Sequence, residues 1–220
     1  MVLLQWTIHM KSAGMDLPKA ILMPVFGPPT PALAPELAAL LPSNADPSGW
    51  VRELPQGPDE KSGLCAGVFL GNPLLQRQRV LFDLKTANLP WVCNLPSVCQ
   101  HDPDFVTNLD EVDLGMAREL ANLAACAEEG FRCIASVATP EDARRAVQMG
   151  FRTLFVLPKV RAYESGFPSE LTRTRAVAAV ADVSEAADVT LLSLVKSSET
   201  MATVVWPTQV QGVIEQPQPV

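Results

Sequence analysis

Polar side chains follow several short apolar runs of this 220-residue chain, at positions where a ligand could be held. Asn94 stands near the end of one run and is followed by Ser97, while Asn72 and Ser136 end two others. An amide or a hydroxyl at such a position can bind a carboxylate or phosphate oxygen. Asn94 is the best single candidate, although a loop asparagine can instead satisfy local backbone groups. Asn72 equally suits a helix N-cap, because Pro73 follows it.

Three carboxylates, Asp110, Glu111 and Asp113, lie within four residues of one another. Mg²⁺ prefers oxygen ligands and often takes one or two carboxylates together with substrate oxygens, so Glu111 and Asp113 are the candidate ligands if Mg²⁺ is bound. The same residues also fit the acidic first turn of a helix beginning at Glu111, where the macrodipole favours negative charge. Apart from this Mg²⁺ hypothesis, the sequence indicates no cofactor.

The thiols and imidazoles give little support to a catalytic or metal site. The spacing of Cys93, Cys99 and His101 fits no common zinc pattern, and a Cys99/His101 nucleophile pair has no third group to orient it. The odd number of cysteines and the lack of a CxxC pair predict reduced core thiols. No GxGxxG, Walker or GxSxG motif is present, so no catalytic residue is assigned.

Composition limits the partners that we expect. The chain has 17 Lys and Arg against 24 Asp and Glu, a net charge of −7, and no basic run, which argues against a nucleic-acid partner. No apolar run reaches the roughly 20 residues that a membrane span requires. A cytoplasmic protein with a small-molecule ligand is expected, and a homo-oligomer stays open.

Three segments differ in composition. Residues 1–60 hold half of the 20 prolines and are predicted to be irregular, with at most a strand at 20–26 and a short helix at 36–41. Residues 61–206 are predicted to form an α/β domain. Residues 207–220, rich in Pro and Gln, are predicted to be disordered.

The middle segment alternates short apolar runs with amphipathic stretches, which predicts parallel strands joined by crossover helices. The predicted strands are residues 64–70, 91–95, 131–137, 151–157 and 189–195. Gly130 and Gly150 each precede a Phe-Arg pair and predict a helix end before a strand, and Thr139 predicts a helix start. Such a pattern leads to a barrel or to a doubly wound open sheet, and it does not choose between them.

A family resemblance favours the barrel. The motifs LCAGVFLGNP (64–73), VCNLPSV (92–98), NLDE (108–111) and ATPEDARRA (138–146), preceded by LAALLP (37–42), resemble the phosphoenolpyruvate-hydrolase-like TIM-barrel family, the TIM-barrel signal transduction domain, over about residues 37–160. The resemblance implies a (β/α) TIM-barrel-like fold with divergent or truncated ends and a ligand site at the barrel mouth. Because only about five βα units are visible, an incomplete barrel is left open.

The chain departs from the family pattern at positions that could carry acid–base chemistry. The family has an acidic residue at the position of Asn72, a phenol at that of Ser136 and a histidine near Leu157-Pro158. The glycine-rich segment that follows Glu111 in the family is also shorter here. The resemblance therefore implies a family-type hydrolase or lyase whose catalytic groups are weakened or lost.

Three functions follow from this resemblance. The chain is an enzyme that acts on a small phosphorylated or carboxylated metabolite, a sensing barrel that binds such a ligand without turning it over, or a truncated barrel without activity. Parallel strands deliver their carboxyl ends to one face, so the candidate ligand-binding residues are expected to converge on one mouth. These candidates are Asn72, Asn94, Ser97, Ser136, Asp110, Glu111 and Asp113.

Overall fold

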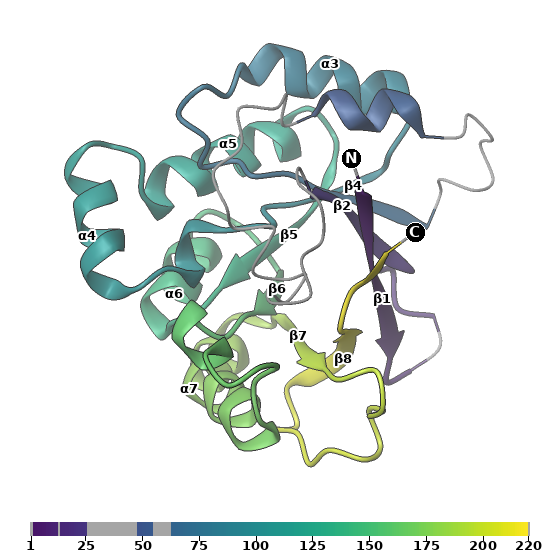
Figure 1. Cartoon of the computed structure of the whole chain (residues 1–220), viewed down its shortest axis with the longest axis vertical. Helices are drawn as coiled ribbons and strands as arrows, with labels where there is room; N and C mark the ends of the chain where they lie inside the picture. Colours follow the sequence, from purple (N-terminus) through teal and green to yellow (C-terminus); the bar gives the residue numbers. More distant parts are fainter. Residues whose placement is uncertain (1, 13, 26–47, 55–62, 220) are drawn as a thin grey trace.

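A computed structural model describes residues 2–12, 14–25, 48–54 and 63–219 (Figure 1). At its centre is a closed barrel of eight strands, β1 to β8, with a short ninth strand beside β1. The strands are β1 (Val2–Met10), β2 (Ala20–Val25), β3 (Leu64–Gly67), β4 (Trp91–Cys93), β5 (Arg132–Val137), β6 (Thr153–Val156), β7 (Thr190–Val195), β8 (Val210–Glu215) and β9 (Gln218–Pro219).

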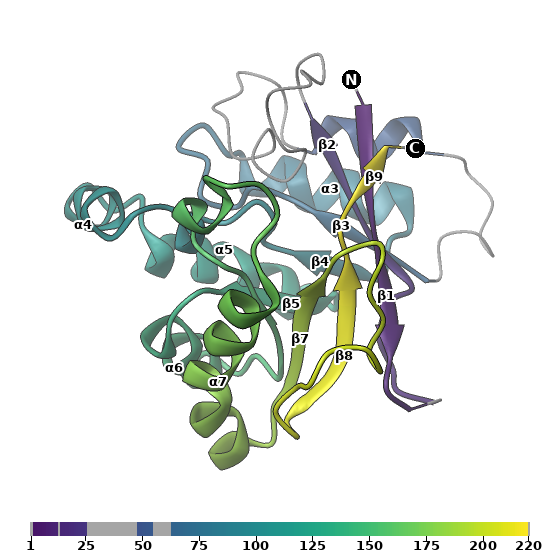
Figure 2. The ribbon, with the colours of Figure 1, turned by 60° about the horizontal axis from the view of Figure 1, so that its bottom comes forward.

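The barrel is mixed. Strands β2 to β8 run parallel in chain order, with pairs such as Cys65↔Trp91 and Ala135↔Leu154. Strand β1 is antiparallel to β2 on one side and to β8 and β9 on the other (Figure 2). The predicted parallel pairing in the middle of the chain is confirmed, and the barrel closes through an antiparallel strand.

Helices cover the outside of the barrel on the side of β3 to β7 (Figure 1). They are α3 (Arg77–Ala87), α4 (Pro103–Glu111), α5 (Met116–Glu128), α6 (Pro140–Gln148) and α7 (Glu170–Ala187), with short 3-10 turns η1 (Gly49–Glu53), η2 (Val98–Gln100) and η3 (Val160–Tyr163). Each parallel step from β3 to β7 passes through at least one helix. This is the crossover arrangement that the sequence pattern predicts.

Local signals fix several helix ends. Helix α6 starts after Thr139, as the sequence predicts, and Thr139 and Asp142 form a reciprocal capping box there. Gly130 and Gly150 have φ angles of 90° and 94°, a left-handed conformation that favours glycine, and each lies between a helix and the next strand. These glycines end α5 and α6 and turn the chain into β5 and β6.

Two apolar cores lie on opposite faces of the sheet, because successive strand residues point to opposite sides. The inner core holds side chains of all eight strands and of loops, but none from α3 to α7: Leu4, Trp6, Ile8, Ile21, Met23, Cys65, Trp91, Cys93, Leu95, Ile134, Phe155, Leu157, Tyr163, Leu192, Leu194 and Ile214. The outer core packs the alternate strand residues, such as Val92 and Ala135, against helix residues such as Leu84 and Leu120. The barrel interior is therefore filled by side chains.

The two ends of the chain are more ordered than the sequence predicts. Residues 1–60 contribute β1 as well as β2, and the tail predicted to be disordered contains β8 and β9. Both corrections have one cause: β1 and β8 are needed to pair the edges of the parallel sheet, and this tertiary pairing outweighs a local composition rich in Pro and Gln. The helix predicted at 36–41 lies outside the described residues.

Two helix starts also differ from the prediction. Helix α3 begins at Arg77 after Gln76, so Asn72 caps a tight turn, with its Oδ1 accepting from Leu74 N at 2.8 Å. Where the sequence predicts a helix that begins at Glu111, α4 instead begins at Pro103 and ends at Glu111. Asp110 and Glu111 consequently end α4 instead of starting a helix.

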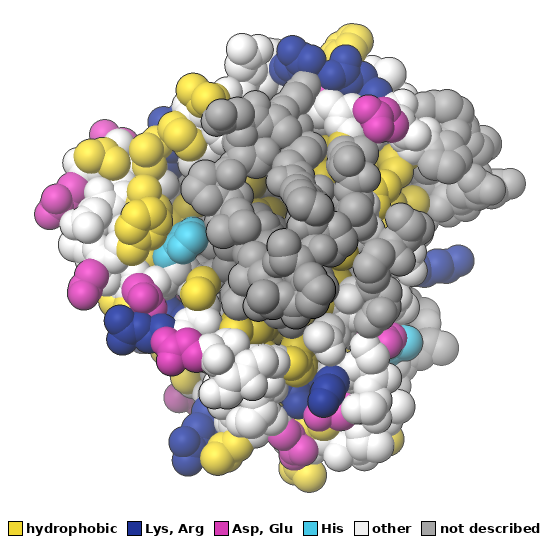
Figure 3. All heavy atoms as spheres, in the orientation of Figure 1, with side chains coloured by type: hydrophobic (Ala, Val, Ile, Leu, Met, Phe, Trp, Pro, Cys, Tyr) yellow, Lys and Arg dark blue, Asp and Glu magenta, His cyan; other side chains and the backbone are white. Residues whose placement is uncertain are grey.

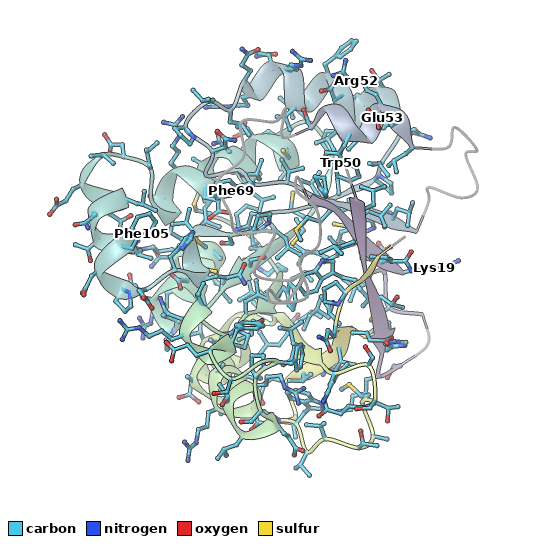
Figure 4. The ribbon with its side chains drawn as sticks, viewed as in Figure 1. Lys19, Trp50, Arg52, Glu53, Phe69 and Phe105 are labelled. Atoms are coloured by element: carbon cyan, nitrogen blue, oxygen red, sulfur yellow. The ribbon has the colours of Figure 1, made fainter. Side chains whose placement is uncertain are left out.

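Two regions outside the barrel are formed by η1 with α3 and by α4. In Figure 4, Trp50 and Arg52 of η1 lie beside α3, where Arg52 and Ser48 contact the buried Asp83 carboxylate. In Figure 3, hydrophobic side chains gather over α4, which carries the half-exposed Phe105. In the described part of the chain, no helix combines the length and the apolar character needed to cross a bilayer.

Truncation of Trp6 tests whether β1 belongs to the barrel. Trp6 is buried in the inner core and meets Phe155 edge to face, with ring centroids 6.2 Å apart. Trp6→Ala should lower the free energy of unfolding by about 3–5 kcal/mol, as expected for a buried aromatic residue. Denaturant unfolding followed by circular dichroism measures it. Val205→Ala, at a position 86% exposed, is the control, and an equally small loss in both variants would contradict a barrel closed by β1.

Candidate functional site

Three of the predicted site residues meet at the ends of β4 and β5. Asn94 Oδ1 accepts a hydrogen bond from Ser136 N at 2.7 Å, and Asn94 Nδ2 donates to Ser97 Oγ at 3.3 Å. All three residues are buried. The last β4–β5 pair is Cys93↔Ile134, so Asn94 satisfies a backbone donor of β5 beyond the end of this ladder.

A buried carboxyl from α5 completes this cluster. Glu119 Oε2 accepts from Ser97 Oγ at 3.0 Å and from Val98 N at 2.9 Å, and the Glu119 side chain is fully buried. Ser97 in turn caps η2, where its hydroxyl accepts from Cys99 N. We call Asn94, Ser97, Glu119 and Ser136 the strand-end cluster. It ties α5 to the loop after β4 and to β5.

The electrostatics of the strand-end cluster favour a neutral carboxyl. Burial raises the pKa of Glu119 from its ordinary value of 4.5 to about 8, while hydrogen bonds from Val98, Ser97 and Asn94 limit the rise. The nearby Cys93 thiol lies 3.6 Å from Ser136 Oγ, and burial raises the pKa of Cys93 to about 12. A thiol with so high a pKa is not an activated nucleophile.

The strand-end cluster therefore mainly holds the loop after β4, strand β5 and helix α5 together. The side chain of Asn94 and Oε2 of Glu119 are engaged with protein partners, whereas Glu119 Oε1 is buried without a hydrogen-bond partner among the described residues, and the adjoining inner core is apolar. Burial also raises the pKa of Cys99 well above its ordinary value and lowers that of His101, so this pair gains no ion-pair activation. Among the described residues, no group of three or more His, Cys, Asp or Glu side chains is placed to hold a metal ion.

A second group of polar residues surrounds a pocket outside the barrel. The pocket has a volume of about 450 Å³ and lies where the start of α3, the end of α4 and the first half of α5 meet. Its lining residues, which define the α3–α5 pocket, are Leu75, Arg77, Asp110, Asp113, Gly115, Ala117, Arg118, Ala121 and Asn122. A cavity of this size is within the range that small-molecule ligands occupy.

The α3–α5 pocket brings together charges of both signs. Two arginines, Arg77 and Arg118, and two aspartates, Asp110 and Asp113, are among its lining residues. Nine ion pairs are found among the described residues, and none of them includes any of these four side chains. Their charges are therefore available to a bound molecule.

The backbone around this pocket breaks two local preferences. Asp110 and Glu111 occupy the last turn of α4, where the helix macrodipole disfavours negative charge. Asp113 adopts a left-handed conformation with φ 57°, which is uncommon for a residue other than glycine. Asp110 also lies against the start of α5, since a Cβ at Gly115 would come within 1.7 Å of Asp110 Oδ1. Gly115 is needed for that close approach.

The predicted site residues therefore separate into two groups. Asn94, Ser97 and Ser136 join the strand-end cluster, and Asp110 and Asp113 line the α3–α5 pocket. Asn72 and Glu111 belong to neither group: Asn72 caps its own turn, and Glu111 is exposed at the end of α4. The seven residues do not converge on one mouth, because α4 carries the carboxylates outward.

Sequence reasoning missed Glu119, Arg77, Arg118 and Asn122. Glu119 had a detectable signal, because it falls on the apolar stripe of α5 that includes Met116, Leu120 and Leu123. A carboxyl on a buried face needs a hydrogen-bonding partner. The two arginines carried no such signal, since a charged residue on a helix is usually a solvated one.

Comparison with known proteins leaves the family open. The chain is 31% identical over 111 residues to "Uncharacterized protein y4oT" of Sinorhizobium fredii (strain NBRC 101917 / NGR234). This match covers 50% of the chain and 57% of the relative, so the chain spans little more than half of the relative's length. No protein-family model matches the chain.

Replacing Glu119 should change how stability depends on pH. A folded-state pKa of about 8, above the ordinary 4.5, means that the neutral carboxyl stabilises the fold below about pH 4.5 and that this contribution is lost as the pH rises through 8. Glu119→Gln, which stays neutral, should reduce the loss of unfolding free energy between pH 5 and 8.5 by an amount on the order of 2–4 kcal/mol. Urea unfolding across this range measures it, with Glu128→Gln at the exposed end of α5 as the control. Parallel curves for wild type and Glu119→Gln would show that Glu119 titrates normally.

Removing the Asn94 amide should destabilise the strand-end cluster. Asn94→Ala leaves the buried Ser136 N–H without its acceptor and should lower the free energy of unfolding by about 1–3 kcal/mol. Hydrogen exchange of the Ser136 amide, measured alongside denaturant unfolding, should show faster exchange in the variant. Unchanged protection of that amide would mean that another group satisfies it.

Proposed function

We propose that this chain is a divergent phosphoenolpyruvate-hydrolase-like barrel that binds a small carboxylated or phosphorylated metabolite in the α3–α5 pocket. In this proposal the mixed barrel is a TIM barrel in which β1 takes the place of a parallel strand. Seven consecutive parallel strands, with helical crossovers from β3 to β7, support it, together with the motifs at residues 64–73 and 92–98.

The observation that carries the proposal is the pair of arginines in a cavity of ligand size. Arg77 and Arg118 line the pocket and make no ion pair with a described residue. A guanidinium matches the geometry of a carboxylate or phosphate and can bind it with two hydrogen bonds. Two guanidinium groups that share a cavity favour an anionic ligand.

The start of α5 adds to this preference. Gly115, Ala117 and Arg118 bring the first turn of the helix to the pocket, and no side chain caps the helix there. The N-terminal end of a helix carries free N–H groups and a partial positive charge. Asp110 already lies against this helix start, and an acid group of a ligand placed between the two arginines would share the same field.

Binding without turnover is the form of this proposal that the described residues favour. Catalysis at the strand ends requires an available acid, base or nucleophile. Ser97 and Oε2 of Glu119 are buried and hydrogen-bonded to the protein, Glu119 Oε1 is enclosed in the buried cluster, and the Cys93 thiol has a raised pKa. These groups hold the fold together, so we place the chain among sensing or carrier barrels.

Calorimetric titration of the wild-type chain with phosphoenolpyruvate and with malate tests the proposal. At least one of the two should bind, and Arg118→Ala should weaken binding by about 10- to 100-fold, because charge-assisted hydrogen bonds are lost. Arg144→Ala removes the same charge on α6, where Arg144 pairs with Glu141, and is the matched control. Equal weakening by both substitutions would point to net charge alone, and an unaffected Arg118→Ala would exclude this pocket.

A further inference from the structure

We infer that the ligand of the α3–α5 pocket is a zwitterion, a small molecule that carries a primary ammonium group as well as an acid group. This inference rests on the proposed function, since the same pocket and the same arginines bind the acid group. It adds a second recognition element for the ammonium group, which consists of the oxygen acceptors of Asp110, Asp113 and Asn122 in the same pocket lining.

The lining of the pocket carries equal numbers of positive and negative side chains. Two carboxylates, Asp110 and Asp113, line the same cavity as Arg77 and Arg118, and the structure has no ion pair between the two sets. Carboxylates near an anionic ligand would repel it unless a positive group lies between them. A purely anionic metabolite therefore matches only half of this lining, whereas a zwitterion matches both halves.

Asn122 also lines the pocket, and this residue is only 5% exposed. Asn122 Nδ2 donates to Leu70 O at 2.8 Å, which fixes the orientation of the amide. Asn122 Oδ1 makes no hydrogen bond with a described residue, and the residue lines the pocket. This fixed acceptor is free to accept a hydrogen bond from a ligand in the pocket, and an ammonium group offers three donors.

Asp113 lines the pocket and has a left-handed backbone conformation. Its left-handed conformation holds the residue in the turn between α4 and α5, beside Gly115, and its side chain is exposed. Asp110 has a competing role, because it lies against the start of α5 and complements the helix dipole. Asp113 has no such role, so it is the residue whose charge best reports on an ammonium group.

Matched ligand pairs test the inference, because each pair differs only in an ammonium group against a hydroxyl. Aspartate is compared with malate, and phosphoserine with 3-phosphoglycerate, by calorimetric titration of the full chain. The amine should bind about tenfold more tightly than its hydroxy partner in at least one pair, which corresponds to one strong hydrogen-bonded charge contact. Asp113→Asn should remove this advantage while it leaves the binding of the hydroxy partner unchanged or stronger.

A control substitution keeps the test specific. Asp188→Asn makes the same chemical change at an exposed residue with nearly the same backbone conformation, φ 51°, at the end of α7. Asp188 does not line the pocket, so this variant should keep the full preference for the amine. Thermal unfolding of both variants verifies that each is folded before binding is compared.

The remaining outcomes separate this inference from the proposed function. Equal binding of amine and hydroxy partners, with both weakened in Arg118→Ala, overturns the zwitterion and keeps an anion site. Binding of the hydroxy acids that appears only with added Mg²⁺ and is lost in Asp113→Asn also overturns it, in favour of a bridging cation. Failure of all four compounds to bind overturns both the zwitterion and the proposed function.

Discussion

A curved sheet whose outer strands are β2 and β8 has two rows of backbone N–H and C=O groups to satisfy, and β1 satisfies both. Its pairs with β2 run from Val2↔Val25 to Thr7↔Ala20, and its pairs with β8 from Ile8↔Ile214 to Met10↔Gly212. Unpaired sheet edges invite association with other chains, so closure by β1 removes a liability as well as adding hydrogen bonds. The two ends of the chain are thereby brought side by side (Figure 2).

Closure with eight strands also determines where a ligand can lie. A barrel of this strand number has an interior just wide enough for side chains, and here Trp6, Phe155 and their apolar neighbours fill it. The polar residues near the end of β4 are engaged in holding strands and α5 together. Unpaired charge is found instead outside the sheet, where α3, α4 and α5 leave a cavity. The packed interior and the external pocket are two consequences of the same geometry.

The features predictable from the sequence are those with local causes. Short-range patterns predict the parallel strands after Gly130 and Gly150, the helix start at Thr139 and the apolar strand that ends before Asn94. Strands β1 and β8 could not be predicted in this way, because the pairing that joins them to each other and closes the barrel spans about 200 residues of the chain. For a related reason, the sequence indicated the aspartates of the pocket but not its arginines. Arg77 and Asp113 line the same pocket only when α3, α4 and α5 pack together.

Helix α5 connects the strand-end cluster to the α3–α5 pocket, because adjacent residues of one helical turn belong to the two sites. Glu119 points to the strand-end cluster and Arg118 to the α3–α5 pocket, and Asn122, one turn later, joins the pocket to the main chain at Leu70. The position of the pocket arginine therefore depends on the hydrogen bonds that Glu119 makes with Ser97 and Val98. A carboxyl buried on the inner face of the helix is thus part of what fixes the geometry of the charged outer face. In the proposed function, the residues that resemble an active site in the sequence therefore act mainly by positioning the residues of the α3–α5 pocket.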